Sequence, residues 1–199
     1  MNKRSQVKTE NKKLEKELLL NKLYAPHRDF KNSPLFIPGE CTSIVFGEGN
    51  PDAEILFIGE APGKMEDLEG RPFVGQSGRL LNRALELAEL KREEVYITNI
   101  VKCRPPNNRT PLPNELAVGR DLLLLDQIQI ISPRIICTLG SAALAGLTQK
   151  SYSIAKIHGS PLSFLDYILL PLYHPAYILR NRSEAPNFLA DIKKIKILL

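Results

Sequence analysis

The amino-acid sequence predicts one three-layer αβα domain with a central, mainly parallel four-stranded sheet. Short apolar runs alternate along the chain with segments in which apolar residues recur at helical spacing. A chain of 199 residues holds one such domain with a sizeable core and is short for two. Strands that alternate with helices form parallel sheets covered on both faces, so the pattern favours this architecture over a barrel or an antiparallel meander.

Each predicted element has a local signal. Four short apolar runs bounded by turn residues are predicted strands: 54–58, 95–100, 134–139 and 167–173. Four segments with helical periodicity are predicted helices: 77–90, 113–131, 142–147 and 186–198. The second of these carries Glu115 in its first turn, where a negative charge stabilises a helix N-terminus. Residues 24–43 are rich in Pro, Asn and Ser and are predicted to be a loop.

Residues 1–22 are predicted to be a basic tail that precedes a single domain over residues 23–199. They hold seven Lys or Arg and three Glu, and so account for +4 of the formal net charge of +5. We expect disorder over residues 1–9 and a short helix over residues 10–23, with Leu14, Leu18 and Leu19 on one face. A basic tail suits a polyanionic partner, and it equally suits a solubilising segment.

Composition excludes several classes of protein. No apolar run approaches the ~18 residues that a membrane span needs, and the charged start is unlike a secretory signal, so we expect no membrane partner and a cytoplasmic location. Three cysteines without a C-x-x-C argue against a disulfide framework, and Cys137, inside an apolar run, is interpreted as a buried small hydrophobe. The chain has no phosphate-binding G-x-x-x-x-G-K-[ST] loop, which argues against a nucleotidase or kinase.

Polar segments rich in Gly and Pro follow the predicted strand ends, where ligands bind in parallel sheets. The first begins Gly59-Glu60-Ala61-Pro62-Gly63 and continues through Glu66 to Phe73. The second runs from Asn99 through Lys102-Cys103-Arg104-Pro105-Pro106 to Arg109, and the last reads His174-Pro175-Ala176-Tyr177-Ile178-Leu179-Arg180. The small residues of the first segment, Gly59, Ala61, Pro62 and Gly63, would let backbone amides approach a ligand.

Together with Phe46-Gly-Glu-Gly-Asn-Pro-Asp-Ala53, these segments resemble the family 4 uracil-DNA glycosylases over about residues 44–195. The resemblance implies an enzyme that releases uracil from single- or double-stranded DNA and leaves the backbone intact. By position, Glu60 matches a carboxylate near the attacking water, and Phe73 matches the ring that stacks on the flipped uracil. Asn99 matches the residue that reads the uracil edge, and His174 matches the residue that contacts uracil O2. Glu66 is a second candidate for the carboxylate.

These roles agree with elementary chemistry. A base inside a duplex is inaccessible, so it must be extruded, and a Phe face recovers part of the cost by stacking. An Asn amide offers one donor and one acceptor, which match uracil and mismatch cytosine. Cleavage leaves negative charge on uracil, which a His donor stabilises, and positive charge on the sugar, which a carboxylate stabilises.

Each of these residues also has a purely structural interpretation. Phe73 could belong to the core, Asn99 could be a turn or cap residue, and His174 could be structural before a proline. Arg104, Arg109, Tyr177 and Arg180 are candidate DNA contacts, although exposed arginine is common. A wedge that fills the vacated stack could come from the segment 177–179, which could equally pack under its own loop. His27 and His158 are interpreted as structural.

An iron–sulfur cluster is predicted to be absent, against the habit of the family. Relatives hold a 4Fe–4S cluster with four cysteines, and only Cys103 stands at a matching position. Counting along the motifs places Asn32, Leu35 and Gly119 at the other three, and Cys41 is the one nearby substitute. We expect no cofactor and no metal, and we expect apolar packing to hold the loop through these residues: Tyr24, Phe30, Leu35, Phe36 and Ile37.

Two functional hypotheses remain. The first is a monofunctional uracil-DNA glycosylase that acts as a monomer on uracil-containing DNA. The second is a non-catalytic DNA- or nucleotide-binding relative that keeps the uracil pocket. The retained Glu60, Phe73, Asn99 and His174 favour the first hypothesis.

Overall fold

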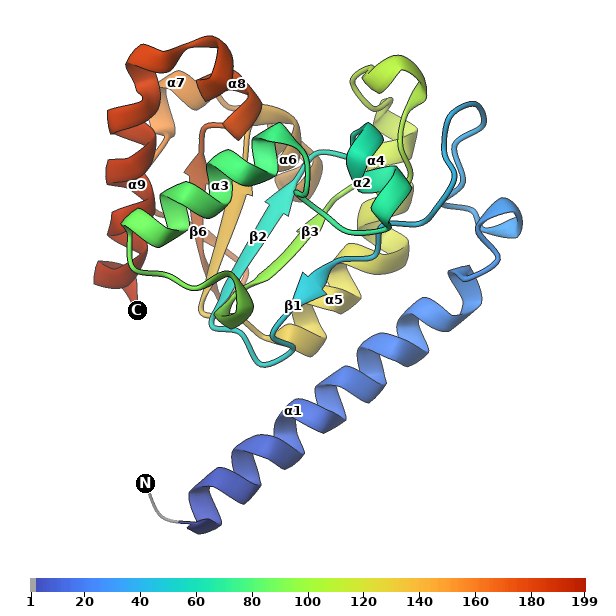
Figure 1. The fold of residues 1–199 in the computed structure, drawn as a ribbon, viewed down its shortest axis with the longest axis horizontal. Helices are drawn as coiled ribbons and strands as arrows, with labels where there is room; N and C mark the ends of the chain where they lie inside the picture. Colours follow the sequence, from blue (N-terminus) through green and yellow to red (C-terminus); the bar gives the residue numbers. More distant parts are fainter. Residues whose placement is uncertain (1–2) are drawn as a thin grey trace.

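The computed structural model describes residues 3–199, which form a six-stranded sheet with helices on both faces (Figure 1). The strands are β1 (Glu48–Gly49), β2 (Ile55–Gly59), β3 (Tyr96–Asn99), β4 (Ile135–Leu139), β5 (Leu162–Phe164) and β6 (Tyr167–Leu172). The α-helices are α1 (Lys3–Tyr24), α2 (Lys64–Glu69), α3 (Gln76–Leu87), α4 (Pro113–Gly119), α5 (Leu125–Ile131), α6 (Ser141–Thr148), α7 (Ile154–Ile157), α8 (Pro175–Arg180) and α9 (Ala185–Leu198).

The predicted three-layer architecture is confirmed, and the sheet has two more strands than predicted. Its order is β1-β3-β2-β4-β6-β5, and the four predicted strands β3, β2, β4 and β6 pair in parallel. The short edge strands β1 and β5 pair antiparallel with β3 and β6. Strands of two and three residues are too short to show an alternating pattern, so periodicity does not predict them.

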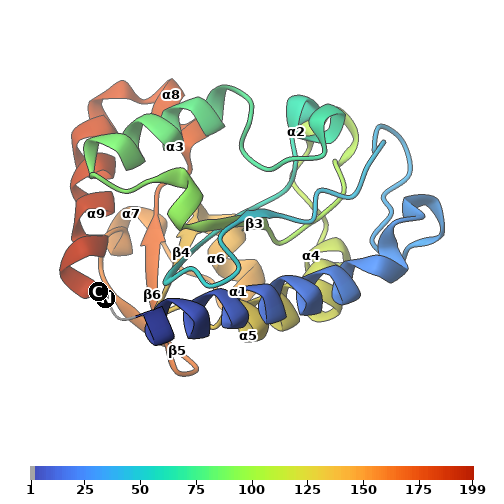
Figure 2. The same cartoon turned by 60° about the horizontal axis from the view of Figure 1, so that its bottom comes forward.

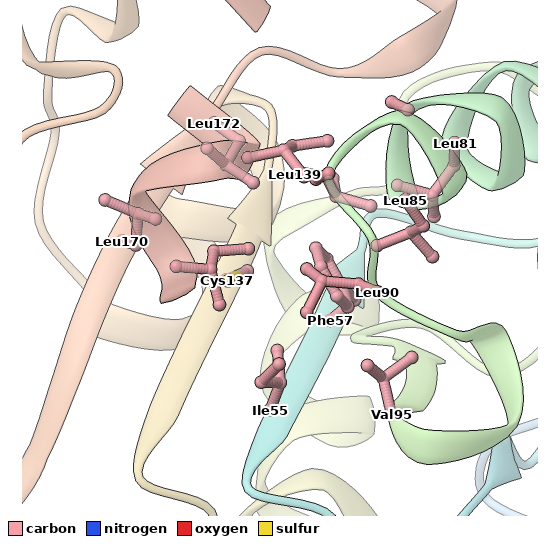
Figure 3. Close-up of a cluster of buried hydrophobic side chains, with 14 of the residues drawn as sticks. Ile55, Phe57, Leu81, Leu85, Leu90, Val95, Cys137, Leu139, Leu170 and Leu172 are labelled. Atoms are coloured by element: carbon pink, nitrogen blue, oxygen red, sulfur yellow. The ribbon is translucent and has the colours of Figure 1, made fainter. Parts of the chain in front are cut away.

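One face of the sheet is covered by α3 and α9. Figure 3 shows Leu81 and Leu85 of α3 beside Leu139 of β4, with Phe57 of β2 below them. All four side chains are at most 1% exposed. Burial of such side chains contributes about 1.5–3 kcal/mol each, which makes this layer a main source of stability.

The other face is covered by α5 and α6, against which Leu56 and Ile58 of β2 pack. The helix predicted over 113–131 is one continuous helical segment here, in which a π-helical stretch, Arg120–Leu124, joins α4 to α5. Both faces of β2 and β4 are therefore buried, as the unbroken apolar runs of a parallel sheet require.

The N-terminal helix is longer than predicted and docks differently. It runs unbroken from Lys3, where disorder was expected over 1–9, and lies along α5 (Figure 2). The predicted apolar face is largely exposed: Leu14, Leu18 and Leu19 are 57%, 54% and 42% accessible. The contact is instead made by Leu20 and by Lys16, whose Nζ donates to Ile131 O at 2.7 Å and to Asp52 Oδ1 at 2.6 Å. Residues 1 and 2 lie outside the described residues.

The cysteines correct one expectation and confirm another. Cys41 and Cys103, 62 residues apart in sequence, form a disulfide with a Cα–Cα distance of 5.6 Å, although the odd cysteine count argued against disulfides. The fold brings the end of the 24–43 loop back over the segment after β3, which cysteine spacing alone does not reveal. Cys137 is free and fully buried in β4, as predicted.

Among the described residues, none of the helices has the length and apolar character needed to span a bilayer.

The loop 24–43 is held by apolar contacts, as predicted. Leu35 and Ile37 are 4% and 6% exposed, and the partly buried Tyr24, Phe30 and Phe36 pack against the same cluster. We call this region, residues 24–43 packed on residues 101–103, the loop corner.

Candidate active site

A cavity of about 630 Å³ opens at the carboxyl ends of the parallel strands, and we call it the strand-end cavity. It lies where the topology of an open α/β sheet places ligands. Its lining combines segments that are far apart in sequence: Glu60, Ala61, Pro62, Gly63, Lys64, Met65, Glu66, Phe73, Gly75, Gln76, Ser77, Asn99, Pro105, Asn108, Arg109, His174, Ala176, Leu179 and Arg180. The fold thus brings together the four principal residues that the sequence singled out.

Phe73 forms one wall of the strand-end cavity. Its backbone has a φ of 52°, a left-handed conformation that is strained for a bulky residue. Gly78 lets the turn sit against α3, because a Cβ there would overlap the Phe73 carbonyl. The Phe73 ring lies over Gly59, where an added Cβ would meet Phe73 Cζ at 2.6 Å and would also overlap Asn99 Oδ1. The missing side chain at Gly59 therefore lets the Phe73 ring and the Asn99 amide both approach the end of β2.

Asn99 ends β3 and is 2% exposed. Its Oδ1 is buried and has no hydrogen-bond partner among the described residues. An unsatisfied buried acceptor costs about 1–3 kcal/mol, so a site that keeps one is prepared for a donor from a ligand. The turn or cap role that was an alternative for Asn99 has no hydrogen bond to support it within the part of the chain that the structure describes.

His174 precedes α8 and caps its N-terminus. Its Nδ1 accepts a hydrogen bond from the Ala176 backbone N–H at 3.0 Å. Burial, with the positive charge of Arg180 as the second cause, lowers the pKa of His174 to about 4, so the ring is neutral at pH 7. A neutral imidazole that accepts at Nδ1 carries its proton on Nε2, which leaves Nε2–H as a donor. The ring centroids of His174 and Phe73 are 5.9 Å apart.

The two carboxylates of the first motif differ in their surroundings. Burial raises the pKa of Glu60, and its carboxylate makes no hydrogen bond within residues 10–199. Glu66 Oε1 accepts from the backbone N–H of Val74 at 3.0 Å and of Gly75 at 2.8 Å. The Glu66 carboxylate therefore holds the turn that follows Phe73, whereas the Glu60 carboxylate is available to a ligand.

The candidate DNA contacts also divide into two groups. Arg109 makes a bidentate ion pair with Glu115 at 2.7 and 2.8 Å, and Arg104 pairs with Glu40 at 2.6 Å. Arg180 is exposed at the cavity rim and makes no ion pair within the described chain. Among the three candidate arginines, Arg180 is thus the one that could meet a phosphate without first breaking an ion pair.

The segment 177–179 resolves into three environments. Ile178 is 2% exposed and belongs to the core, so it is not available as a wedge. Leu179 is 41% exposed and lines the cavity, and Tyr177 is 37% exposed outside it.

Several other residues that line the strand-end cavity were not predicted from the sequence: Lys64, Met65, Gln76, Ser77 and Asn108. They follow motif residues on α2, α3 and the 99–113 segment, and their proximity to the motifs was the only signal available.

The loop corner holds a second, smaller cavity of about 160 Å³. Leu35 and Gly119, two of the positions that motif counting predicts for cluster cysteines, both line it beside Val101 and Lys102. The fold therefore brings these two counted positions to one cavity, beside the Val101–Lys102 segment that precedes Cys103. The third, Asn32, is exposed, and its amide donates to Asp29. Among the described residues, no three His, Cys, Asp or Glu side chains gather as a metal site.

Comparison with known proteins agrees with this geometry. The family described as the uracil DNA glycosylase superfamily matches residues 46–195. A type-4 uracil-DNA glycosylase of Thermotoga maritima is 49% identical over 78% of this chain and 82% of its own, and that of Saccharolobus solfataricus is 45% identical over 77% and 75%. A type-5 uracil-DNA glycosylase of Thermus thermophilus is 37% identical over about half of each chain, 51% and 52%. With three quarters of its length matched and its motif residues gathered around one cavity, the chain belongs to the uracil-DNA glycosylase superfamily.

Proposed function

We propose that this chain excises uracil from DNA by hydrolysing the N-glycosidic bond, which leaves an abasic site in an intact strand. Its similarity to type-4 uracil-DNA glycosylases supports the activity. The observation that carries the proposal is the buried, unpartnered Asn99 Oδ1, which lies with the Phe73 ring in the lining of the strand-end cavity. This arrangement suits one flat ring with a hydrogen-bond donor at its edge.

The same arrangement supports a choice of uracil over cytosine. Asn99 Oδ1 accepts from uracil N3–H, and its amide nitrogen donates to O4. Cytosine presents an acceptor at N3 and a donor at N4, so both contacts would be mismatched. A site that leaves polar groups unpaired with the wrong ligand discriminates strongly, by as much as about 10⁴-fold.

His174 supplies the donor for the leaving group. As the glycosidic bond breaks, negative charge accumulates on uracil, and the Nε2–H of the neutral imidazole donates to O2. The lowered pKa of His174 keeps this ring neutral at the working pH, so it donates without losing a proton. A positioned donor of this kind contributes about 10²–10³-fold to the rate.

Glu60 is the carboxylate that acts on the sugar side. Its ionised form stabilises the positive charge that develops on the sugar and orients the attacking water. Glu66 is assigned a different role, because its Oε1 already binds two backbone amides of the 73–75 turn. It positions Phe73 and does not touch the reacting atoms.

The chemistry needs no amine nucleophile, which agrees with excision without strand cleavage. Lys102 is fully buried, and its Nζ donates to Thr98 Oγ1 and Gln127 Oε1, both at 2.6 Å. It cannot reach a sugar in the strand-end cavity. Lys64 lines that cavity and is exposed, so strand cleavage before alkali is the result that would implicate it.

The DNA lies over the strand-end cavity, with Arg180 at its rim meeting a phosphate. Arg109 and Arg104 can join only by exchanging a carboxylate partner for a phosphate, which makes their contribution smaller. Single- and double-stranded DNA are both proposed as substrates. The monomeric state and the cytoplasmic location stay predictions.

The chain is proposed to work without an iron–sulfur cluster. Such a cluster needs thiolate ligands, usually four. The loop corner offers Cys103 and Cys41, which are joined to each other. Leu35 and Gly119, at two of the other predicted ligand positions, have no thiol to offer. Cys137, in the sheet, is remote from this corner. The residues present therefore do not fit the group.

The proposed activity is tested with a labelled oligonucleotide that contains one uracil, as a single strand and opposite guanine or adenine. We expect intact strands after incubation and cleavage at the uracil position only after alkali. The matched controls are a thymine oligonucleotide and a Glu60→Gln variant. Uracil DNA that survives alkali at several salt concentrations, while still binding the protein, would instead support the non-catalytic relative.

A further inference from the structure

Three aromatic rings stack in a column beside the turn that carries His174. The ring of His158 lies 4.3 Å from that of Tyr173, with planes 29° apart. The ring of Tyr173 lies 4.9 Å from that of Tyr177, with planes 22° apart. Tyr173 directly precedes His174, and Tyr177 is on α8, so the stacked pair spans the His174 turn.

The inner end of the column is fixed to α9 by a buried carboxylate. Asp191, whose side chain is 4% exposed, contacts His158 Nδ1 through Oδ2 at 2.6 Å. Its Oδ1 accepts from Lys194 Nζ at 2.9 Å, and the same Nζ donates to Gly159 O at 3.0 Å. Gly159 has a φ of +66°, and a Cβ there would overlap the Asp191 carboxylate. The carboxylate is therefore held from two directions, and it holds His158. We call Asp191, His158, Tyr173 and Tyr177 the ring clamp.

The His174 turn depends on contacts of this kind. Its Nδ1 accepts from a backbone amide of α8, so the direction of Nε2–H follows the position of that helix. A helix of six residues has little stability of its own and relies on tertiary contacts. On one side, α8 is anchored by Ile178 in the core. On the other side, the stack of Tyr177 on Tyr173 is its connection to the clamp.

We propose that the ring clamp positions His174, so that Asp191 and His158 set the direction of the Nε2–H donor without touching the substrate. The inference rests on the proposed function, because it assigns supporting residues to the same reaction. Residues that contact a functional histidine on the side away from the substrate affect the cleavage rate only by changing the orientation of that histidine. The clamp should therefore affect bond cleavage and leave DNA binding nearly unchanged.

The test measures single-turnover excision from a single-stranded uracil oligonucleotide, together with the dissociation constant for that DNA. Asp191→Asn and Tyr173→Leu are expected to lower the cleavage rate about 10-fold and to change the dissociation constant less than about twofold. Tyr173→Phe keeps the ring and is expected to restore most of the rate. The matched control is Asp52→Asn, which removes another carboxylate with two cationic partners, Lys12 and Lys16, far from the cavity.

A double-mutant cycle separates positioning from a general loss of structure. In a His174→Ala background, the clamp substitutions should have no further effect on the residual rate, because the group they position is gone. Equal losses in both backgrounds, or no loss in either, would overturn the inference.

A second measurement does not depend on activity. The chain has only three histidines, so selective ¹⁵N labelling resolves each ring. The wild type should show His174 protonated at Nε2 alone, and Asp191→Asn should show a mixture of tautomers at His174 with His27 unchanged. A pure Nε2–H signal in that variant would overturn the clamp even if excision occurs. If the wild type excises no uracil while Asp191→Asn shows the mixture of His174 tautomers, the proposed function is overturned and the clamp is retained.

Discussion

The strand-end cavity and the loop corner share one segment of chain, and they differ in how closely they follow the family. Asn99 and Pro105 line the strand-end cavity, while Val101 and Lys102 line the loop corner between them. On the cavity side, every principal motif residue is retained. On the corner side, Asn32, Leu35 and Gly119 stand at three of the four positions that motif counting predicts for cluster cysteines, and apolar packing and a disulfide hold the loop.

The difference follows from what each region must do. The strand-end cavity has to present particular atoms at particular places, such as an amide oxygen and an imidazole N–H, and few residue types supply them. The loop corner has only to keep residues 24–43 against the segment after β3. Buried apolar side chains and a covalent link can do this as well as a cluster can.

The substitution with the largest expected effect is Asn99→Asp, on the cavity side. An ionised aspartate keeps the acceptor for N3–H but turns the amide donor into a second acceptor that repels O4. We expect uracil excision to fall by about 10³-fold and the ratio of uracil to cytosine excision to fall with it. Paired single-turnover rates on uracil and cytosine oligonucleotides measure both. A variant that excises uracil at the wild-type rate would remove Asn99 from the recognition role.

Next in size is His174→Ala, which removes the donor to uracil O2. We expect the cleavage rate to fall by about 10²–10³-fold with little change in DNA affinity. A loss of affinity equal to the loss of rate would indicate ground-state binding and contradict the assigned role.

The pH dependence of the wild type separates His174 from Glu60. The pKa of His174 is about 4, so its neutral, donating form persists down to that pH. The raised pKa of Glu60 makes its ionised form disappear first as the pH falls. The rate should therefore decline at acidic pH with the titration of Glu60, and the residual rate of Glu60→Gln should lack that decline. A decline centred near 6.5 that vanishes in His174→Ala would contradict the low pKa.

A smaller effect is expected from Glu66→Ala, which releases the turn after Phe73. Two backbone amides lose their acceptor, and the left-handed Phe73 backbone loses its support. We expect KM to rise about 10-fold with a smaller change in kcat, since the loss of ring stacking acts mainly on binding. The control is Glu69→Ala, an exposed carboxylate on the same helix. A kcat loss above about 100-fold at unchanged KM would return Glu66 to a catalytic role.

The smallest effect on activity is expected from Cys41→Ser, on the corner side. Opening a 62-residue loop removes about 4 kcal/mol of stability in the chain-entropy account and lowers Tm by roughly 10 °C. The excision rate at 25 °C should remain within about twofold of wild type, because neither cysteine lines the strand-end cavity. Thermal unfolding with and without a thiol reductant provides the comparison. A loss of excision without a change in Tm would mean that the disulfide serves the site directly.

The same two regions differ in how far the sequence predicted them. The parallel strands and the principal cavity residues, Glu60, Phe73, Asn99 and His174, were predictable, because buried strands show as apolar runs and the motifs follow their ends. The edge strands β1 and β5 were too short to give a pattern. The disulfide depends on a contact between residues 62 apart, and the docking of α1 depends on the burial of a lysine, Lys16, which hydrophobic periodicity assigns to the solvent.

The ion pairs of Arg104 and Arg109 and the hydrogen bonds of Glu66 could not be predicted from the sequence either. Each side chain has the residue type that its predicted role requires, and the structure joins each one to a neighbour that only the fold supplies. Motifs therefore identified the residue types of the site, while the division of labour between Glu60 and Glu66 required their surroundings.

The most direct test of this account measures iron content and uracil excision on one anaerobically purified preparation. We predict a colourless protein without the broad absorption near 400 nm of an iron–sulfur cluster, without iron by metal analysis, and with full single-turnover excision that a chelator does not reduce. About four irons per chain, or excision that appears only in an iron-loaded fraction, would contradict it.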